Sequence, residues 1–298
     1  MFQKFVGTKY ISRTKQVPTQ VAFLPLYNNG ERACIVVPGT SNVLNSSDII
    51  GEVGLGCLRL DMIREVLWFN LGYPMELINL QNQNLYNLLQ TLRKESVNVA
   101  IALDLNGASS SLLQDPWSLI KEALEHVALV HMNWDEAIAL NCNSNSDGNT
   151  NVDASTATIE QLDELAQPFL DRGVAIVTIT LGCHGAYIGV HSERTHIQNQ
   201  LGVACLNDND VENWCQTKSI LSPLPIRTND SGGSGDTVGA GDSFVAGMLL
   251  CLESMALNKD TDNQKRNTLN DVLNFAQKCA GDMINGSSDD GCSMETKE

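Results

Sequence analysis

The sequence predicts a three-layer α/β fold, in which a mostly parallel central sheet carries helices on both faces. Short apolar runs typical of strands alternate with stretches of helical periodicity, a pattern typical of parallel βαβ units. Two of these runs, 97–105 and 174–181, are almost continuously apolar, as expected of strands that helices cover on both faces. Polar motifs follow several of the strands, and ligands of such sheets bind at the carboxyl ends of strands.

The first expected elements are two short strands joined by a tight turn. The apolar stretches 21–27 and 33–37 flank Asn28-Asn29-Gly30, which is a strong hairpin signal. Pro38-Gly39 then ends the second strand. Further along we expect a loop and a helix within 46–65, a buried strand at 66–70 and a helix at 85–94.

Local capping signals locate the next helices. Asp115 followed by Pro116 is a typical helix start, and Thr158-x-x-Gln161 forms a capping box for a helix that stops at Gly173. The segment between them holds a strand at 128–131 and a polar surface loop at 141–157. The remaining expectations are short antiparallel strands and loops at 182–190 and 193–226, and a last helix at 268–284.

Composition narrows the class of protein. The chain has 298 residues with 19 basic and 35 acidic side chains, a net charge of −16, which argues against a nucleic-acid surface. Its nine cysteines are dispersed without a C-x-x-C pair, a pattern typical of reduced thiols in the cytoplasm. The N-terminus lacks an apolar signal core, and no run reaches the roughly 18 apolar residues of a membrane span. We therefore expect a cytoplasmic protein without a membrane partner.

The stretch from Asp236 to Phe244 carries the most specific chemistry. Gly239 and Gly241 open a helix whose apolar face follows at helical spacing: Phe244, Val245, Met248, Leu249, Leu252 and Met255. The unpaired N–H groups at a helix start bind anions, and glycines let a ligand approach the backbone. A phosphate would repel the Asp242 carboxylate, so we expect Asp242 to have a task, namely accepting a proton from a hydroxyl that attacks phosphorus.

The string Asp-Thr-Val-Gly-Ala-Gly-Asp at 236–242 resembles the second signature of the ribokinase-like sugar kinases, the PfkB family. The resemblance implies that the backbone of Gly239, Ala240 and Gly241 forms an anion hole and that Asp242 is the catalytic base. It also implies that Asp236 and Thr237 lie at the nucleotide. A monovalent cation such as K⁺ would contact Asp236 and the Val238 carbonyl.

Two further motifs resemble the family's nucleotide side. Asn133-x-x-Glu136 is by itself a typical helix start, and the resemblance implies that it orders Mg²⁺ and the phosphates through water. Thr180-Leu-Gly182-Cys-His-Gly185 is either a plain strand-to-hairpin turn or the family's turn along the nucleotide. In the second interpretation, Thr180, Gly182 and Gly185 contact the cofactor ATP.

The acceptor side resembles the family less completely. Asp104-x-Asn106 is similar to the family's Asp-x-Asn segment, but Gly107 and Ala108 stand where an arginine often follows. Residues 20–42 resemble half of the family's β lid, which implies that Gly39, Asn42 and Asp104 lie near the substrate. The resemblance also implies a homodimer through the lid.

We read 1–298 as a single ribokinase-like kinase domain that is N-terminally incomplete, with 20–42 as the remnant of the lid. The family begins with a strand bearing an acidic residue and a Gly-Gly-x-x-x-Asn segment, and neither precedes the hairpin here. We expect the chain by itself to be inactive or marginally stable, with a nucleotide half that is intact from about Asn98 onward.

The expected function is that of an ATP-dependent carbohydrate kinase, which transfers the γ-phosphoryl group to a hydroxyl of a sugar or sugar-like substrate. Two alternatives stay open. One is a nucleoside kinase of the same fold, and the other is a non-catalytic nucleotide-binding relative. A dinucleotide oxidoreductase is excluded because no Gly-x-Gly-x-x-Gly follows an early strand.

Overall fold

The computed structural model describes residues 17–23, 35–50, 66–96, 98–109, 113–141, 153–202, 208–223, 238–257 and 268–285. Its main element is a six-stranded sheet in the order β3-β4-β5-β6-β7-β8. The strands β3 to β6 pair in parallel, whereas β7 is antiparallel to both β6 and β8, so the expected mostly parallel α/β sheet is confirmed. The strands are β3 Trp68–Gly72, β4 Ala100–Asp104, β5 Leu129–Asn133, β6 Ile176–Thr180, β7 Ala186–Val190 and β8 Lys218–Leu221.

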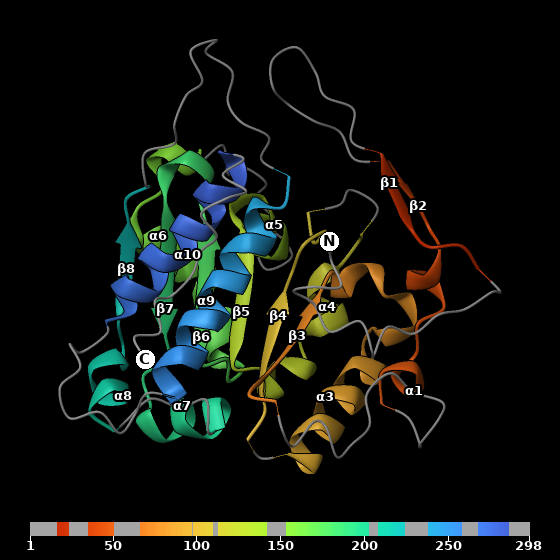
Figure 1. Ribbon diagram of the computed structural model, residues 1–298, viewed down its shortest axis with the longest axis horizontal. Coiled ribbons are helices and arrows are strands. Elements are labelled where there is room, and N and C mark those ends of the chain that lie inside the picture. Colours follow the sequence, from red (N-terminus) through yellow and green to blue (C-terminus); the bar gives the residue numbers. More distant parts are fainter. Residues whose placement is uncertain are drawn as a thin grey trace, which may run out of the picture.

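Helices cover both faces of this sheet. The longer ones are α3 Gln83–Glu95, α6 Ile159–Asp171, α9 Ala240–Leu257 and α10 Leu269–Ile284. The shorter ones are α1 Ser46–Ile49, α4 Pro116–Ile120, α5 Trp134–Asn141, α7 Arg194–Leu201 and α8 Asp208–Trp214. In Figure 1, α9 and α10 (blue) lie in front of the sheet, and the start of α9 lies beside the end of α10, toward the carboxyl ends of the parallel strands.

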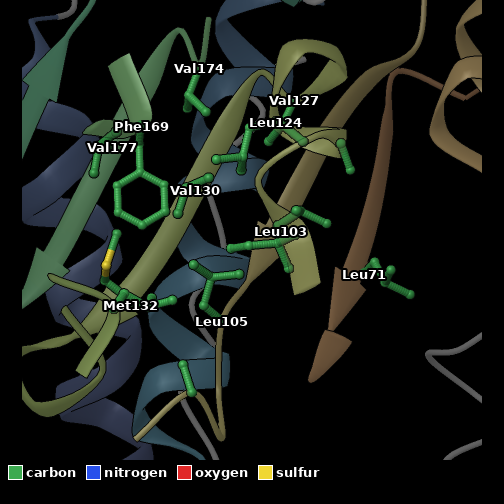
Figure 2. Close-up of a cluster of buried hydrophobic side chains, with 14 of the residues drawn as sticks. Leu71, Leu103, Leu105, Leu124, Val127, Val130, Met132, Phe169, Val174 and Val177 are labelled. Carbon is green, nitrogen blue, oxygen red and sulfur yellow. The ribbon is translucent and has the colours of Figure 1, made fainter. Parts of the chain in front are cut away.

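The two faces of the sheet bury two separate apolar cores. Along β4, Ile101 and Leu103 join the core under α3 and α6, whereas Ala100 and Ala102 join the core under α7, α9 and α10. Figure 2 shows the first core, in which strand residues lie in one layer with Phe169 of α6. This two-sided burial explains why the strand sequences are almost continuously apolar rather than alternating.

The expected helix starts are confirmed. The Asp115 side chain accepts a hydrogen bond from the Ser118 N–H at 3.1 Å, with Pro116 at the first helical position. Thr158 caps α6 and Thr268 caps α10, each through a reciprocal capping box. Gly173, which follows α6, has a φ of 97°, a left-handed conformation that favours glycine.

The first two strands, β1 Val21–Phe23 and β2 Ile35–Val37, form a separate antiparallel pair in which Val21 lies opposite Val37. This pairing confirms the hairpin, while its expected turn at Asn28-Asn29-Gly30 lies outside the described residues. The pair (red in Figure 1) stands apart from the main sheet, and its side chains are exposed.

The prediction of strands and loops throughout 193–226 is wrong in part. Only β8 is a strand there, whereas 194–201 and 208–214 are the helices α7 and α8. The sequence of α7 is mostly polar, and Ile197 and Leu201, one turn apart, are its buried apolar residues. Two apolar positions give too weak a period to be recognised without the sheet against which they pack.

One described helix, α9, is long and apolar enough to span a membrane by length and composition. A core helix passes the same test. Phe244, Met248 and Leu252 of α9 are buried in the core shared with β4, β5 and α10. Its apolar character is therefore accounted for by packing within the fold.

Candidate active site

The motifs of the sequence converge where the parallel strands end. β4 ends at Asp104, β5 at Asn133 and β6 at Thr180, and these ends are neighbours because the strands pair in parallel register. α9 begins nearby at Ala240 and carries Asp242 in its first turn. The topology therefore brings together residues that are up to 138 positions apart, as expected at the carboxyl edge of an α/β sheet.

The start of α9 has the backbone of an anion site. The first intrahelical bond runs from the Ser243 N–H to the Gly239 carbonyl at 2.9 Å, so the N–H groups before Ser243 have no acceptor within the helix. Gly239 has a φ of 80°, where a side chain would be strained. Gly241 has an ordinary φ, and among the described residues an added Cβ would approach only His131 Cε1, at 3.9 Å. Neither backbone strain nor packing requires glycine at 241, which leaves close approach of a ligand as the physical reason for it.

Asp242 belongs to a network of polar side chains. The Asn106 amide nitrogen donates to Asp104 Oδ2 at 2.9 Å and lies 3.4 Å from Asp242 Oδ1, which also accepts from it. Asp104 Oδ1 lies 2.9 Å from Nδ1 of His131. Asp104 is 2% exposed, and each of its oxygens has a partner. We expected Asp104 near the substrate. It is instead buried beneath the site and is connected to Asp242 through the Asn106 amide.

His131 is a member of this site that the sequence analysis missed. It is 1% exposed, its ring lies 5.3 Å from that of Phe244, and its Nε2 has no hydrogen-bond partner among the described residues. A single histidine in an apolar strand ordinarily indicates a core position. The available signal was that His131 is a polar residue in an apolar strand two residues before Asn133, and the sheet places it opposite Asp104 at the end of β4.

The charges of the site alter its acidities. Partial burial raises the pKa of Asp242, the charge of Asp104 raises it further, and His131 acts in the opposite direction. Burial together with the carboxylates of Asp242, Asp104, Glu76 and Glu136 raises the pKa of Tyr73 to about 12. Tyr73 is 42% exposed and has a left-handed backbone (φ 56°), which is uncommon for a residue with a side chain. It therefore places an aromatic ring at the edge of an acidic site.

Asn133 and Glu136 form a reciprocal cap at the start of α5. The Glu136 N–H donates to Asn133 Oδ1 at 2.9 Å, and the Asn133 N–H donates to Glu136 Oε2 at 2.8 Å. Glu136 Oε1 accepts from the Gly107 N–H at 3.1 Å, and Glu136 is 3% exposed. Burial raises the pKa of Glu136. With both oxygens held by backbone donors, this carboxylate fits Mg²⁺ only through water; within the described residues, no group of three or more His, Cys, Asp or Glu could hold a metal.

The turn after β6 joins two strands of the sheet. The Leu181 N–H donates to the Gly185 carbonyl at 2.8 Å, and Gly182 and Gly185 both have left-handed backbones. A Cβ at Gly185 would collide with the Leu221 carbonyl, whereas one at Gly182 would meet nothing within 4 Å. Gly185 is thus explained by packing, and Gly182 combines a left-handed backbone with open space next to Thr180.

The segment before the main domain lies beside the end of β3. Gln20 Nε2 donates to Glu76 Oε2 at 2.6 Å, and the Ser41 hydroxyl donates to Gln20 Oε1. A Cβ at Gly39 would collide with the backbone at Pro18, so packing requires that glycine. Asn42 ends a short 3₁₀ helix, Thr40–Asn42. Of the other predicted site residues, Asp236 and Thr237 lie outside the described residues.

The fold is that of the ribokinase-like carbohydrate kinases. The chain is similar to ribokinase from Giardia lamblia, with 13% identity, a TM-score of 0.60, and 92% of this chain and 69% of that one covered. It is similar to Arabidopsis thaliana ribokinase complexed with ribose and ATP, with 19% identity, a TM-score of 0.56, and 90% and 64% covered. Adenosine kinase from Sinorhizobium meliloti matches with 15% identity, a TM-score of 0.57, and 90% and 61% covered.

The chain therefore spans about two thirds of the length of these solved proteins. No protein-family model matches the sequence, and no curated protein matches it. At these identities the likeness shows the fold, which sugar and nucleoside kinases share.

Proposed function

We propose that this chain is an ATP-dependent kinase that transfers the γ-phosphoryl group to a hydroxyl of a sugar or sugar-like substrate. The observation that carries the proposal is the start of α9. There, Asp242 stands in the first turn, beside backbone N–H groups without an intrahelical acceptor and a glycine that nothing in the described fold requires. A helix start of this kind binds phosphate, and a carboxylate beside that phosphate is placed to accept a proton from an attacking hydroxyl.

In the proposed reaction, the backbone N–H groups of Gly239, Ala240 and Gly241 hold the charge that develops on the transferred group. Asp242 orients the acceptor hydroxyl toward phosphorus and takes its proton as the new P–O bond forms and the bond to ADP breaks. Most of the rate enhancement comes from positioning, because phosphoryl transfer proceeds through a loose transition state in which the proton leaves late.

The nucleotide is proposed to lie along the turn after β6, next to Thr180, Gly182 and Gly185, and the resemblance adds Asp236 and Thr237 to its contacts. Asn133 and Glu136 would hold Mg²⁺ through water, and the ion supplies neutralisation of the phosphate charge. We also propose that a monovalent cation such as K⁺ contacts Asp236 and the Val238 carbonyl.

The acceptor is proposed to enter between the end of β3 and the segment around Gly39 and Asn42, which the Gln20–Glu76 hydrogen bond ties together. The half-exposed ring of Tyr73 at this edge can stack on the apolar face of a sugar, and equally on a base. This ring and the likeness to an adenosine kinase favour a nucleoside kinase as the second candidate.

The test measures ADP release from Mg-ATP, alone and with a panel of sugars and nucleosides, since water can replace the acceptor when the acceptor pocket is not complete. We expect Asp242→Asn to bind Mg-ATP with an affinity within about threefold of the parent chain. We expect its ADP release to fall by about 10²–10⁴, the usual cost of losing a positioned base.

The matched control is Glu160→Gln, which also removes an exposed carboxylate from the first turn of a helix, here α6. This control keeps the parent rate. If Asp242→Asn and Glu160→Gln release ADP equally fast, Asp242 is not the base. If the parent chain binds Mg-ATP but neither hydrolyses nor transfers it, the chain is a nucleotide-binding relative without catalysis.

A further inference from the structure

A buried hydrogen-bonded chain lies directly beneath the proposed base. It runs from His131 Nδ1 to Asp104 Oδ1 at 2.9 Å, and from Asp104 Oδ2 to the Asn106 amide at 2.9 Å. The same amide nitrogen reaches Asp242 Oδ1 at 3.4 Å. The sequence positions are distant, but β4 and β5 bring Asp104 and His131 opposite each other.

Burying these hydrogen-bonded side chains costs the fold free energy. Asp104 and His131 continue the columns in which Ala102 and Leu129 face the core under α9, so the two polar groups take positions that apolar side chains would fill without penalty. A buried pair of this kind is weak evidence for stability, because well-packed apolar residues often do as well or better. A role at the neighbouring Asp242 accounts for its presence.

The backbone around Asn106 is fixed on both sides. The Leu105 N–H donates to the His131 carbonyl at 2.9 Å, and the Gly107 N–H donates to Glu136 Oε1 at 3.1 Å. The Asn106 side chain therefore has a rigid base, and Asp104 fixes the direction of its amide. A group held this firmly can restrict the orientation of a carboxylate that otherwise stands free at the surface.

We propose that His131, Asp104 and Asn106 form a positioning chain for Asp242, in which the Asn106 amide, aligned by the buried Asp104–His131 pair, holds the carboxylate of the base in one orientation. The inference rests on the proposed function and deepens it, because it assigns three further residues to the same site. None of the three needs to touch the substrate. His131 acts through Asp104, Asp104 through Asn106, and Asn106 through Asp242.

Two substitutions of His131 separate this role from direct contact with a ligand. An asparagine amide nitrogen lies three bonds from Cα, as Nδ1 does, so His131→Asn can still donate to Asp104. A glutamine amide nitrogen lies four bonds from Cα, as Nε2 does, so His131→Gln replaces the nitrogen that has no partner here. The positioning chain predicts that His131→Asn retains more kcat than His131→Gln.

Asn106→Ala removes the last link at a half-buried position and leaves the core intact. We expect kcat for ADP release to fall about 10- to 100-fold, with the KM for ATP within about threefold, because the orientation of the base is lost while the anion site is unchanged. Thr178→Val is the matched control. Thr178 is fully buried opposite His131 on β6, and its hydroxyl donates to the Val130 carbonyl at 3.3 Å. This variant keeps the parent kcat.

Crystal structures of the parent chain and Asn106→Ala provide a readout that does not require turnover. The expected result is a single Asp242 rotamer in the parent and several in the variant. If neither the parent chain nor any variant releases ADP, the proposed function fails. The two crystal structures then decide by themselves whether Asn106 orients the Asp242 carboxylate. An unchanged Asp242 rotamer in Asn106→Ala, or a higher kcat in His131→Gln than in His131→Asn, overturns the inference.

Discussion

Asp242 is the proposed base, and its electrostatic environment is unfavourable for a carboxylate. Partial burial and the nearby charge of Asp104 raise its pKa, which means that the folded protein holds the ionised carboxylate less well than the unfolded chain does. The group thus contributes stability only while it is protonated, and this contribution is lost as the pH rises through the raised pKa. The proposed function of this residue therefore opposes stability.

The consequence can be measured without any substrate. We expect Asp242→Asn to melt at a higher temperature than the parent chain at neutral pH, because the substitution removes the disfavoured charge. The difference should shrink as the pH falls through the raised pKa of Asp242 and should vanish below its ordinary value, where both proteins are neutral at this site. Thermal melts from acid to neutral pH check the sign, and a variant that melts below its parent at neutral pH would contradict it.

Gly241 is the second residue whose identity the fold leaves unexplained. A Cβ has room there, so Gly241→Val should leave the melting temperature of the nucleotide-free protein nearly unchanged. The branched side chain should nevertheless weaken Mg-ATP binding by at least about tenfold, because it occupies the approach of the phosphates to the helix start. Calorimetry measures this directly. An unchanged affinity would mean that the glycines only begin the helix.

At the scale of elements, the site depends on how closely α9 packs against α10. Gly247 of α9 faces the backbone of Ala276 and the side chain of Cys279, and a Cβ at 247 would lie 2.9 Å from Ala276 Cα. The glycine therefore allows the two helices to approach, and this approach fixes where the start of α9 lies over the sheet.

Two glycine-to-alanine substitutions should have opposite effects. Gly247→Ala should lower the free energy of unfolding by about 1–3 kcal/mol, because the helices must move apart to accept a methyl group. Gly281→Ala, in α10, meets nothing within 4 Å and should raise that free energy by about 0.5–1 kcal/mol through helix propensity. Denaturant titrations of both variants measure the difference, and equal effects would show that the close helix approach is unimportant.

At the scale of the whole molecule, the proposed nucleotide side of the site is built on the interior strands β4, β5 and β6. The β1–β2 pair and the edge strand β3 are more exposed. Exposed strand edges and apolar side chains favour association with another chain, and a homodimer through the β1–β2 pair stays a prediction. The nucleotide side should therefore be the more robust part of the protein, and low turnover of sugars by this chain stays a prediction.

We expect Mg-ATP to raise the melting temperature of the 298-residue chain. A ligand at about 100 times its dissociation constant adds roughly 2.7 kcal/mol to the stability of the folded state. Gly241→Val is the control, and its melting temperature should rise much less at the same concentration. A melt that Mg-ATP leaves unchanged would show that the nucleotide site is not formed in this chain.

The sequence by itself determined the features that depend on neighbouring residues. Asp115, Thr158 and Thr268 start their helices as local capping chemistry requires, and the glycines before Asp242 begin α9. The apolar runs identified the parallel strands β3 to β6 to within about three residues, since burial on both faces leaves a signal in the composition of each run.

Tertiary structure alone decided which of these elements meet. The helix α7 was missed because its two buried apolar residues indicate a helix only once the sheet against which they pack is known. The pairing of His131 with Asp104 was missed for the same reason, since strand order and register, not sequence spacing, place residues 27 positions apart within 2.9 Å. Local sequence fixes the conformation of a segment, whereas contacts between segments depend on free energies summed over the whole packed core.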